Sequence, residues 1–364
     1  MASATDNSYN VSTPRSASIT LVDSDDPPET VLWSDNLHTD TSANWTKLFA
    51  TTNGAPDDET VTWAYDYSGI LVPPAPHSGA DTHGLYLTVN KLDTIPACAA
   101  LNLYPNGQSF SGNYALRFDM CLIENSTSGQ TEYALFGINH SGTKTNWFRS
   151  SATGFTGVDP VGWSFDGLFY DVESDGADLG EYVGYSSPTT AGHNPTPITA
   201  AVTAETMAPV FKAPPWTRAG TAANLYGSTT ATWADVELRQ VNGVIYWSIN
   251  HSLVFAYTNT TGYTTGNIML GYEDGFDSIG SSGGGVIYAN ARVINLASLV
   301  ISGVSSNSLN YSGGVGSQFV LLKTADLTQP KSTWTRVHTN NTPSGSFTIP
   351  VGSEARAFYT IKSE

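Results

Sequence analysis

Apolar and polar residues alternate one by one along residues 234–241, which read ADVELRQV. A period of two places alternate side chains on opposite faces of a β-strand. Asn242 and Gly243 follow at once, and this pair suits a tight hairpin turn because both residues tolerate positive φ. A returning strand is predicted over 244–249, then a turn at 250–251 and a strand over 253–257. This stretch therefore predicts antiparallel β-structure.

The same alternation predicts strands in much of the remaining chain. They lie at 31–37, 62–67, 84–90, 113–122, 131–139, 267–272 and 286–293. In 286–293 one face is expected to carry Ile287, Ala289, Ala291 and Val293. No window of roughly ten residues between 31 and 296 has helical periodicity. Many strands joined by Gly- and Pro-bearing turns favour an all-β sandwich or jelly roll.

Composition limits the classes of partner. The 364 residues include 32 Asp and Glu but 15 Lys and Arg, a net charge of −17. Nucleic-acid binding requires clustered basic side chains, so no nucleic-acid partner is expected. No apolar run approaches the roughly 20 residues that span a bilayer, so no membrane span is predicted. The first residues lack the basic and apolar regions of a signal peptide. The low charged fraction of 13% is typical of exported β proteins.

The strand motifs resemble one known family. They comprise WSDNL at 33–37 with Trp45, and the segments 118–119, 132–142, 270–279 and 288–293. Together they resemble the concanavalin A-like (LamG-type) jelly roll of exported proteins from Planctomycetes and Verrucomicrobia. The resemblance implies one jelly-roll domain over residues 30–297. Such domains often have Asp, a calcium ligand, where this chain has Ala289, so their structural calcium is not expected here.

The two ends resemble other modules. Residues 16–26 resemble the closing strand of a Calx-beta domain, which implies an N-terminal tail over 1–29 with one strand. A lone strand has unpaired edges and must dock on its own chain or on a neighbour, so self-assembly is considered. Residues 298–364 resemble the small C-terminal Ig-like modules of the same exported proteins. Such modules usually act as spacers or anchors.

Carboxylates recur at alternating positions after residue 170, and calcium binds about six to eight oxygens from such loops. The predicted calcium ligands are Asp171, Glu173, Asp175 and Asp178. The segment is not an EF-hand, because the closing bidentate Glu of that loop would fall on Tyr182. A short acidic turn between strands explains the same pattern, and both interpretations stay open.

Aromatic side chains in or beside predicted loops are candidates for stacking on sugar rings. They are Trp147, Trp163, Tyr182, Tyr185 and Trp216. The last three lie in a long Pro-, Thr- and Gly-rich stretch over 182–228, where a binding or assembly surface is expected. Burial in a core is the alternative for each of these rings.

Arg117, Asp119 and Glu132 are further candidate ligand-binding residues. Asp119 and Glu132, on strands expected to be adjacent, are also the remaining carboxylate pair to test for glycoside hydrolysis. The E-x-D-x-E run of jelly-roll glucanases is absent, since Asp235-Val-Glu237 supplies two of its three residues. Solvent-facing or cross-strand-paired charge is the favoured role for both carboxylates. Cys98 and Cys121 form either a disulfide or two buried thiols.

The leading interpretation is an exported or cell-surface protein without catalytic activity that binds a polysaccharide or glycoconjugate or supports adhesion. A polysaccharide hydrolase or lyase on the same scaffold is the alternative. The third interpretation is a structural subunit of an extracellular assembly.

Overall fold

The computed structural model describes residues 30–52, 58–92, 94–123, 132–147, 165–173, 182–186, 196–197, 233–280, 284–296, 299–304, 308–313, 318–342, 344–349 and 357–363. Their regular structure is β-strand, with short 3-10 turns η1 (Ser42–Asn44), η2 (Tyr67–Ile70) and η6 (Lys331–Thr333). None of the helices among these residues is long and apolar enough to cross a membrane. The all-β class predicted from sequence is confirmed. The N-terminal strand expected at 17–22 lies outside the described residues.

One large sheet, called sheet A here, has the strand order β14-β13-β12-β7-β16-β4-β3, and β1 also pairs with β16. Its strands are β1 (Val31–Asp35), β3 (Glu59–Asp66), β4 (His83–Val89), β7 (Tyr114–Ile123), β12 (Ala234–Val241), β13 (Val244–Ile249), β14 (Ser252–Thr258) and β16 (Gly285–Asn295). All of these pairings are antiparallel.

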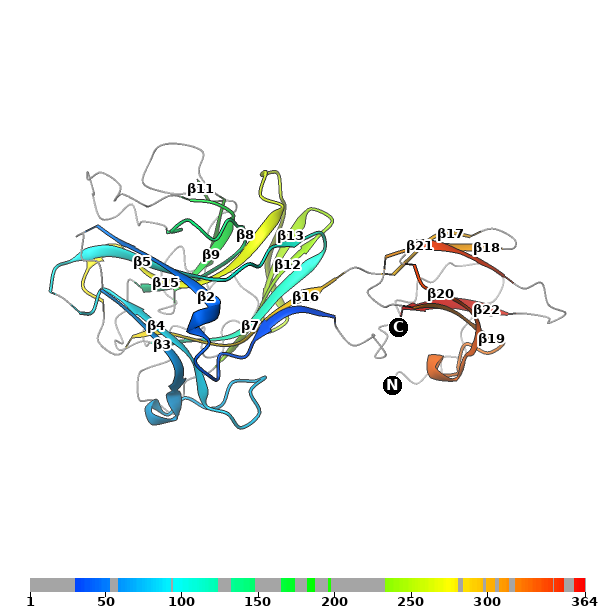
Figure 1. Ribbon diagram of the computed structural model, residues 1–364, viewed down its shortest axis with the longest axis horizontal. Coiled ribbons are helices and arrows are strands. Elements are labelled where there is room, and N and C mark those ends of the chain that lie inside the picture. The colour runs from blue at the N-terminus through cyan, green and yellow to red at the C-terminus, as the bar shows by residue number, and fades with distance from the viewer. Residues whose placement is uncertain are drawn as a thin grey trace, which may run out of the picture.

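A second large sheet, sheet B, has the order β11-β10-β9-β8-β15-β5-β2, with β6 beside β15. Its strands are β2 (Trp45–Thr51), β5 (Ala97–Pro105), β6 (Phe110–Ser111), β8 (Glu132–His140), β9 (Leu168–Glu173), β10 (Tyr182–Ser186), β11 (Thr196–Pro197) and β15 (Thr265–Ser278). The two sheets form the two layers in Figure 1. The chain crosses between them repeatedly, which confirms the expected two-sheet jelly-roll sandwich.

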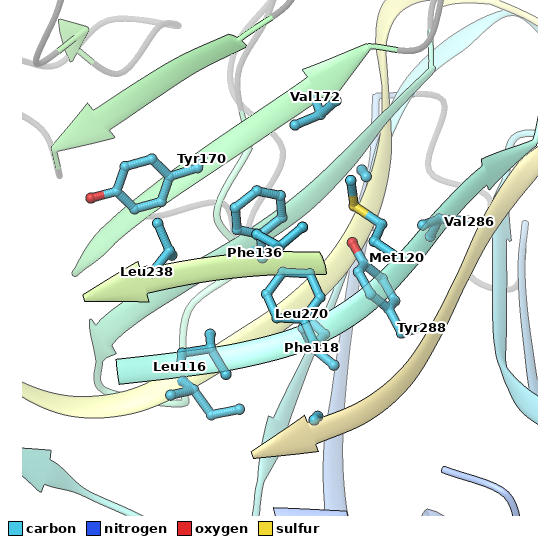
Figure 2. Packing of buried hydrophobic residues seen from close by; sticks show 14 of the residues in the cluster. Leu116, Phe118, Met120, Phe136, Tyr170, Val172, Leu238, Leu270, Val286 and Tyr288 are labelled. Atoms are coloured by element: carbon cyan, nitrogen blue, oxygen red, sulfur yellow. The ribbon is translucent and has the colours of Figure 1, made fainter. Parts of the chain in front are cut away.

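The main core lies between the two sheets. The Phe118 ring of sheet A lies 5.1 Å from Phe136 of sheet B and 5.5 Å from Tyr288. Figure 2 shows these rings interleaved with aliphatic side chains from both layers. Strand β12 alternates buried and half-buried positions along its whole length, as its sequence pattern predicts. Each fully buried large apolar side chain contributes about 1.5–3 kcal/mol to folding.

The last strand of sheet A differs from the expectation. Asn290 has a φ of 55°, and the pairing of β16 with β7 shifts register between Ala289 and Arg292. This β-bulge reverses the facing of the side chains that follow it. Ile287 and Ala289 therefore pack outside the sandwich, whereas Ala291 and Val293 belong to the main core. The prediction that all four share one face is wrong.

Both predicted tight turns are confirmed. Asn242 and Gly243 have φ values of 51° and 79°, and Asn250 and His251 have values of 48° and 63°. Paired positive φ values are those of a type I′ hairpin, whose twist matches the twist of the flanking strands.

The two cysteines are buried thiols rather than a disulfide. Cys98 packs with Ala100 and Trp147 on sheet B, whereas Cys121 packs with Ile287 on sheet A. Each lies on the side of its sheet that faces away from the main core, so the whole sandwich separates the sulfurs.

Two three-stranded sheets follow the sandwich: β17-β18-β21 and β20-β19-β22. Their bounds are β17 (Val300–Val304), β18 (Ser308–Ser312), β19 (Phe319–Thr324), β20 (Thr335–Asn340), β21 (Ser344–Thr348) and β22 (Phe358–Ser363). A separate cluster around Tyr311, Phe319 and Phe347 fills the space between them. The strands confirm a small β region here, while the domain boundaries and the Ig-like resemblance stay predictions.

Candidate functional site

The outer face of sheet A is the face turned away from the main core, and it carries polar side chains in register. Asp119 of β7 lies opposite Asp235 of β12, and Arg117 lies opposite Glu237. These positions alternate with the buried residues of the core because successive side chains of a strand point to opposite faces. Arg117, Asp235 and Glu237 are half-buried, so this face is partly open to solvent.

A loop between η2 and β4, residues 71–82 and called the His77 loop here, covers one end of this face. Tyr67 and Trp233 pack edge-to-face beneath it with ring centroids 5.2 Å apart. The Trp233 indole nitrogen donates a hydrogen bond of 2.7 Å to the Pro73 carbonyl. Val72 and Ala75 join the same apolar cluster with Cys121. These contacts hold the loop against the sheet and bring His77 to Asp119.

Three side chains converge there. The His77 Nδ1 atom lies 2.7 Å from Asp119 Oδ1, and the His77 backbone N–H donates to Asp119 Oδ2 at 3.1 Å. The Asn290 amide donates to the same Oδ2 at 2.7 Å. One potential ligand atom from each of His77, Asp119 and Asp235 lies within 4.8 Å of the other two. The Asp119 side chain is 0% exposed and that of His77 is 41% exposed.

More imidazoles surround this group. His251 Nε2 lies 3.6 Å from Asp235 Oδ2. His38 contacts Ser78 Oγ at 2.8 Å, and Ser78 also accepts from Asn290 at 2.7 Å. Four of the seven histidines, including His83 beside Asp81, therefore lie near three aspartates. Hydrogen bonds from the His83 side chain and backbone lower the pKa of the half-buried Asp81 carboxyl.

Further along the outer face, one arginine contacts a carboxylate and another lies over an aromatic ring. Arg117 Nε donates to Glu237 Oε2 at 2.7 Å. The Arg239 guanidinium lies 4.7 Å from the centroid of the Tyr246 ring. Such planar donors, carboxylate acceptors and ring faces can hydrogen-bond hydroxyls and cover the apolar faces of sugars.

The aromatic residues predicted to bind sugar lie elsewhere. Trp147 is buried and stacks with Phe165 at 5.7 Å, Tyr182 belongs to the main core, and Tyr185 stacks on Phe169 at 5.0 Å. Their ring faces contact protein in place of solvent, so they offer no open stacking surface here. Trp163 and Trp216 lie outside the described residues. The binding role of all five stays a prediction.

Asp119 and Glu132 do not lie on adjacent strands, and that expectation is wrong. Strand β7 pairs with β12 and β16, whereas β8 pairs with β9 and β15 in the other sheet. Asp119 faces outward, while Glu132 lies opposite Asp274 on sheet B. The chain crosses from sheet A to sheet B between β7 and β8, which separates the two carboxylates.

Of the predicted calcium ligands, the structure describes the Asp171 side chain. It is fully buried on β9 and accepts a hydrogen bond of 3.0 Å from the Val183 N–H. Burial raises the pKa of this carboxyl well above its usual range, which favours the neutral form that binds calcium poorly. The Glu173 side chain, Asp175 and Asp178 lie outside the described parts, so the calcium loop stays a prediction.

Sequence reasoning missed His77, Asp235 and Asn290 as partners of Asp119. Together with Asp119 they come from four distant segments, and the register of β7 against β12 was not readable from either strand alone. One sequence signal could have found them. Asp119 and Asp235 are like charges that both occupy outward-facing positions of strands with strong apolar–polar alternation.

No family model and no curated protein matches this sequence. Three solved structures illustrate its similarity to known folds. A Bacillus subtilis protein of unknown function with a galectin-like fold shares 9% identity at a TM-score of 0.37, over 73% of this chain and 97% of its own. The exoplasmic/lumenal domain of VIP36, in a form bound to Ca2+ and Man3GlcNAc, shares 9% at 0.38, over 75% and 93%. An endo-β-1,3-glucanase from Pyrococcus furiosus shares 14% at 0.38, over 73% and 94%.

At this level of similarity no ligand, residue or activity is carried over from these proteins. The pairing of the chain's own strands establishes its class: an all-β sandwich of two large antiparallel sheets.

Proposed function

We propose that the sandwich is a glycan-binding module without catalytic activity, exported or displayed at the cell surface. Its ligand is a polysaccharide or glycoconjugate, bound on the outer face of sheet A. The observation that supports this surface is the half-buried row of Arg117, Glu237, Arg239 and Tyr246. Sugar hydroxyls take hydrogen bonds from charged donors and acceptors, and a ring face covers their C–H surface.

The outer side of sheet B is less suited to this role. Its side chains, among them Leu135, Phe169 and Met269, are buried in a second apolar cluster. A saccharide requires an accessible polar surface with a few apolar contacts. This contrast favours sheet A as the binding face.

The proposal includes a three-part organisation. Residues 1–29 form a tail whose strand resembles a Calx-beta remnant, 30–297 the binding module, and 298–364 a small Ig-like spacer or anchor. The tail is then the segment through which the exported protein assembles with itself or with neighbouring domains.

Binding to a glycan array and titration calorimetry with the best ligand test the function. We expect Tyr246→Ala and Glu237→Gln each to weaken binding about tenfold, since each removes a contact of roughly 1–2 kcal/mol. Tyr359→Ala is the matched control, because Lys323 lies 5.9 Å from its ring in the same kind of pair on a C-terminal sheet. That variant should bind as the wild type does.

Two outcomes contradict the proposal. Absence of binding to every glycan leaves the structural-subunit alternative. Release of reducing sugar from a polysaccharide, lost in Asp119→Ala or Glu132→Ala, supports the hydrolase or lyase. Asp119 faces outward on sheet A and Glu132 lies on sheet B, which argues against their acting as one catalytic pair.

A further inference from the structure

The three converging side chains beneath the His77 loop have a use beyond glycan contact. We propose that His77, Asp119 and Asp235 bind one divalent transition-metal ion, of the zinc class, on the outer face of sheet A. The site is independent of the glycan surface, which lies further along β12 and β13.

Two rigid elements bring the three side chains together. Antiparallel pairing of β7 with β12 sets Asp119 directly opposite Asp235. The hydrogen bond from Trp233 to the Pro73 carbonyl fixes the His77 loop over these two strands. Residues distant in sequence therefore present one imidazole nitrogen and two carboxylate oxygens within 4.8 Å of one another. Three protein ligands with a position left for water is a common arrangement for zinc.

The buried carboxylate is oriented by its neighbours. Asp119 Oδ2 accepts from the Asn290 amide at 2.7 Å and from the His77 backbone at 3.1 Å. These two donors leave Oδ1 directed at His77 Nδ1. Hydrogen bonds of this kind orient the ligands of metal sites. The bulge at Asn290, with its φ of 55°, is what places the amide there.

The observed spacing fits a small ion after a short movement. His77 Nδ1 and Asp119 Oδ1 lie 2.7 Å apart, within hydrogen-bond distance. Metal bonds of about 2.0–2.1 Å in a tetrahedron require ligand atoms roughly 3.3–3.4 Å apart. The imidazole must therefore withdraw by less than about 1 Å. Its side chain is 41% exposed and has room to do so.

The local charge also calls for a cation. Two carboxylates directly opposite each other on neighbouring strands repel, and Asp119 is completely buried. Among the described residues, the salt bridges of Asp119 and Asp235 are with His77 and His251 rather than with Lys or Arg. A bound dication neutralises both carboxylates and leaves the imidazoles uncharged as ligands.

The donor set selects the class of metal. Calcium prefers an all-oxygen shell of about six to eight atoms, whereas imidazole nitrogen suits zinc, copper and nickel. His251 offers a second imidazole, with Nε2 3.6 Å from Asp235 Oδ2 and a side chain that is 91% exposed. Two carboxylates and one or two imidazoles around a small space fit Zn2+ better than Ca2+.

Calorimetric titration of metal-free, full-length protein with ZnCl2 tests the site, with CaCl2 titrated in parallel. We expect one Zn2+ per chain at micromolar affinity or tighter, and a higher melting midpoint with Zn2+ than with Ca2+. Co2+ substitution should give the intense visible absorption of a tetrahedral site with nitrogen and oxygen ligands. His77→Gln and Asp235→Asn should each weaken Zn2+ binding by about 10–100-fold.

Both substituted side chains are partly exposed, at 41% for His77 and 18% for Asp235, so these variants are expected to fold. His83→Gln is the matched control, because His83 pairs with Asp81 at 2.8 Å outside the three-residue group. It should bind Zn2+ as tightly as the wild type. The inference is overturned if Zn2+ gives neither heat nor a midpoint shift, or if Ca2+ binds more tightly than Zn2+. It is also overturned if a variant carrying both His77→Gln and Asp235→Asn still binds Zn2+ at full affinity.

Discussion

Asp274 lies at one end of the sandwich, where its carboxyl is opposite Glu132 across the β15–β8 pairing. It accepts hydrogen bonds from the Asn90 amide at 3.1 Å and from Ser278 Oγ at 2.8 Å. Burial, followed by the charge of Glu132, raises the pKa of Asp274 to about 7. Burial also lowers the pKa of the neighbouring Lys91 to about 8, so Lys91 stays protonated while Asp274 titrates.

This raised pKa makes folding stability depend on pH. Between about pH 4 and pH 7 the folded protein holds a proton on Asp274 that the unfolded chain has released, so stability falls as pH rises through this window. A shift of this size corresponds to an upper limit of about 4 kcal/mol. We expect Asp274→Asn to flatten this dependence and to raise the free energy of unfolding at pH 7, as measured by urea denaturation at several pH values.

Asp40→Asn serves as the control for that series. Hydrogen bonds from Ser42 lower the pKa of the exposed Asp40 carboxyl, so its contribution to the pH dependence has the opposite sign. A steeper fall of stability in Asp274→Asn than in the wild type between pH 4 and pH 7 would contradict the assignment of this proton to Asp274.

Along strand β15, Gly271 lies between β5 and β8, where the three backbones approach closely. A Cβ atom at this position would lie 2.4 Å from the Leu101 carbonyl oxygen and 3.3 Å from the Leu135 Cβ. The oxygen belongs to the backbone and cannot rotate away, so a methyl group forces the strands apart. We expect Gly271→Ala to destabilise the protein by about 2–3 kcal/mol, measured by chemical denaturation.

Gly262→Ala is the comparison variant, because a Cβ there meets nothing within 4 Å. It should unfold within about 0.5 kcal/mol of the wild type. Equal stability of Gly271→Ala and Gly262→Ala would show that the strands can separate at no cost, against the close packing of β15.

The sequence predicts where single strands lie, and which of their side chains face the core, better than it predicts which strands pair with each other. Alternation along 234–241 and 113–122 correctly separated core from outer-face residues, because side-chain parity is local. The expectation that β7 and β8 are adjacent failed, because nothing local says in which layer the next strand lies. The bulge at Asn290 was equally hidden, since it arises from the pairing of β16 with β7 and not from any signal in the strand's own sequence.

The candidate site was predictable only in part, because its residues are brought together by contacts between distant segments. Arg117 and Asp119 were identified as candidates, but the His77 loop reaches Asp119 through the tertiary contact of Trp233 with Pro73. Three of the aromatic residues expected in or beside loops are instead buried. Trp147 and Tyr185 cover the outer side of sheet B, and Tyr182 lies in the main core. Composition supports burial and exposure of such rings equally well.

Over the whole molecule, the apolar clusters divide the described chain into two bodies. The sandwich has its main core between sheets A and B, with smaller clusters on its outer sides. The C-terminal sheets have their own cluster, built from Leu309 to Ile361, and Figure 1 shows these sheets beyond the end of β16. Among the described residues, the clusters of the sandwich and the cluster of the C-terminal sheets have no residue in common.

Separate cores predict separate unfolding. A chain ending at residue 297 should retain the thermal midpoint of the sandwich within about 2 °C, because truncation removes no side chain from its clusters. Scanning calorimetry of the full chain should resolve a second, smaller transition that the truncated chain lacks. Because a body of fewer than about 70 residues buries little apolar surface, that transition should be the less stable of the two. A lowered midpoint in the truncated chain, or one cooperative transition in the full chain, would mean that the C-terminal sheets stabilise the sandwich and are not a spacer joined to it.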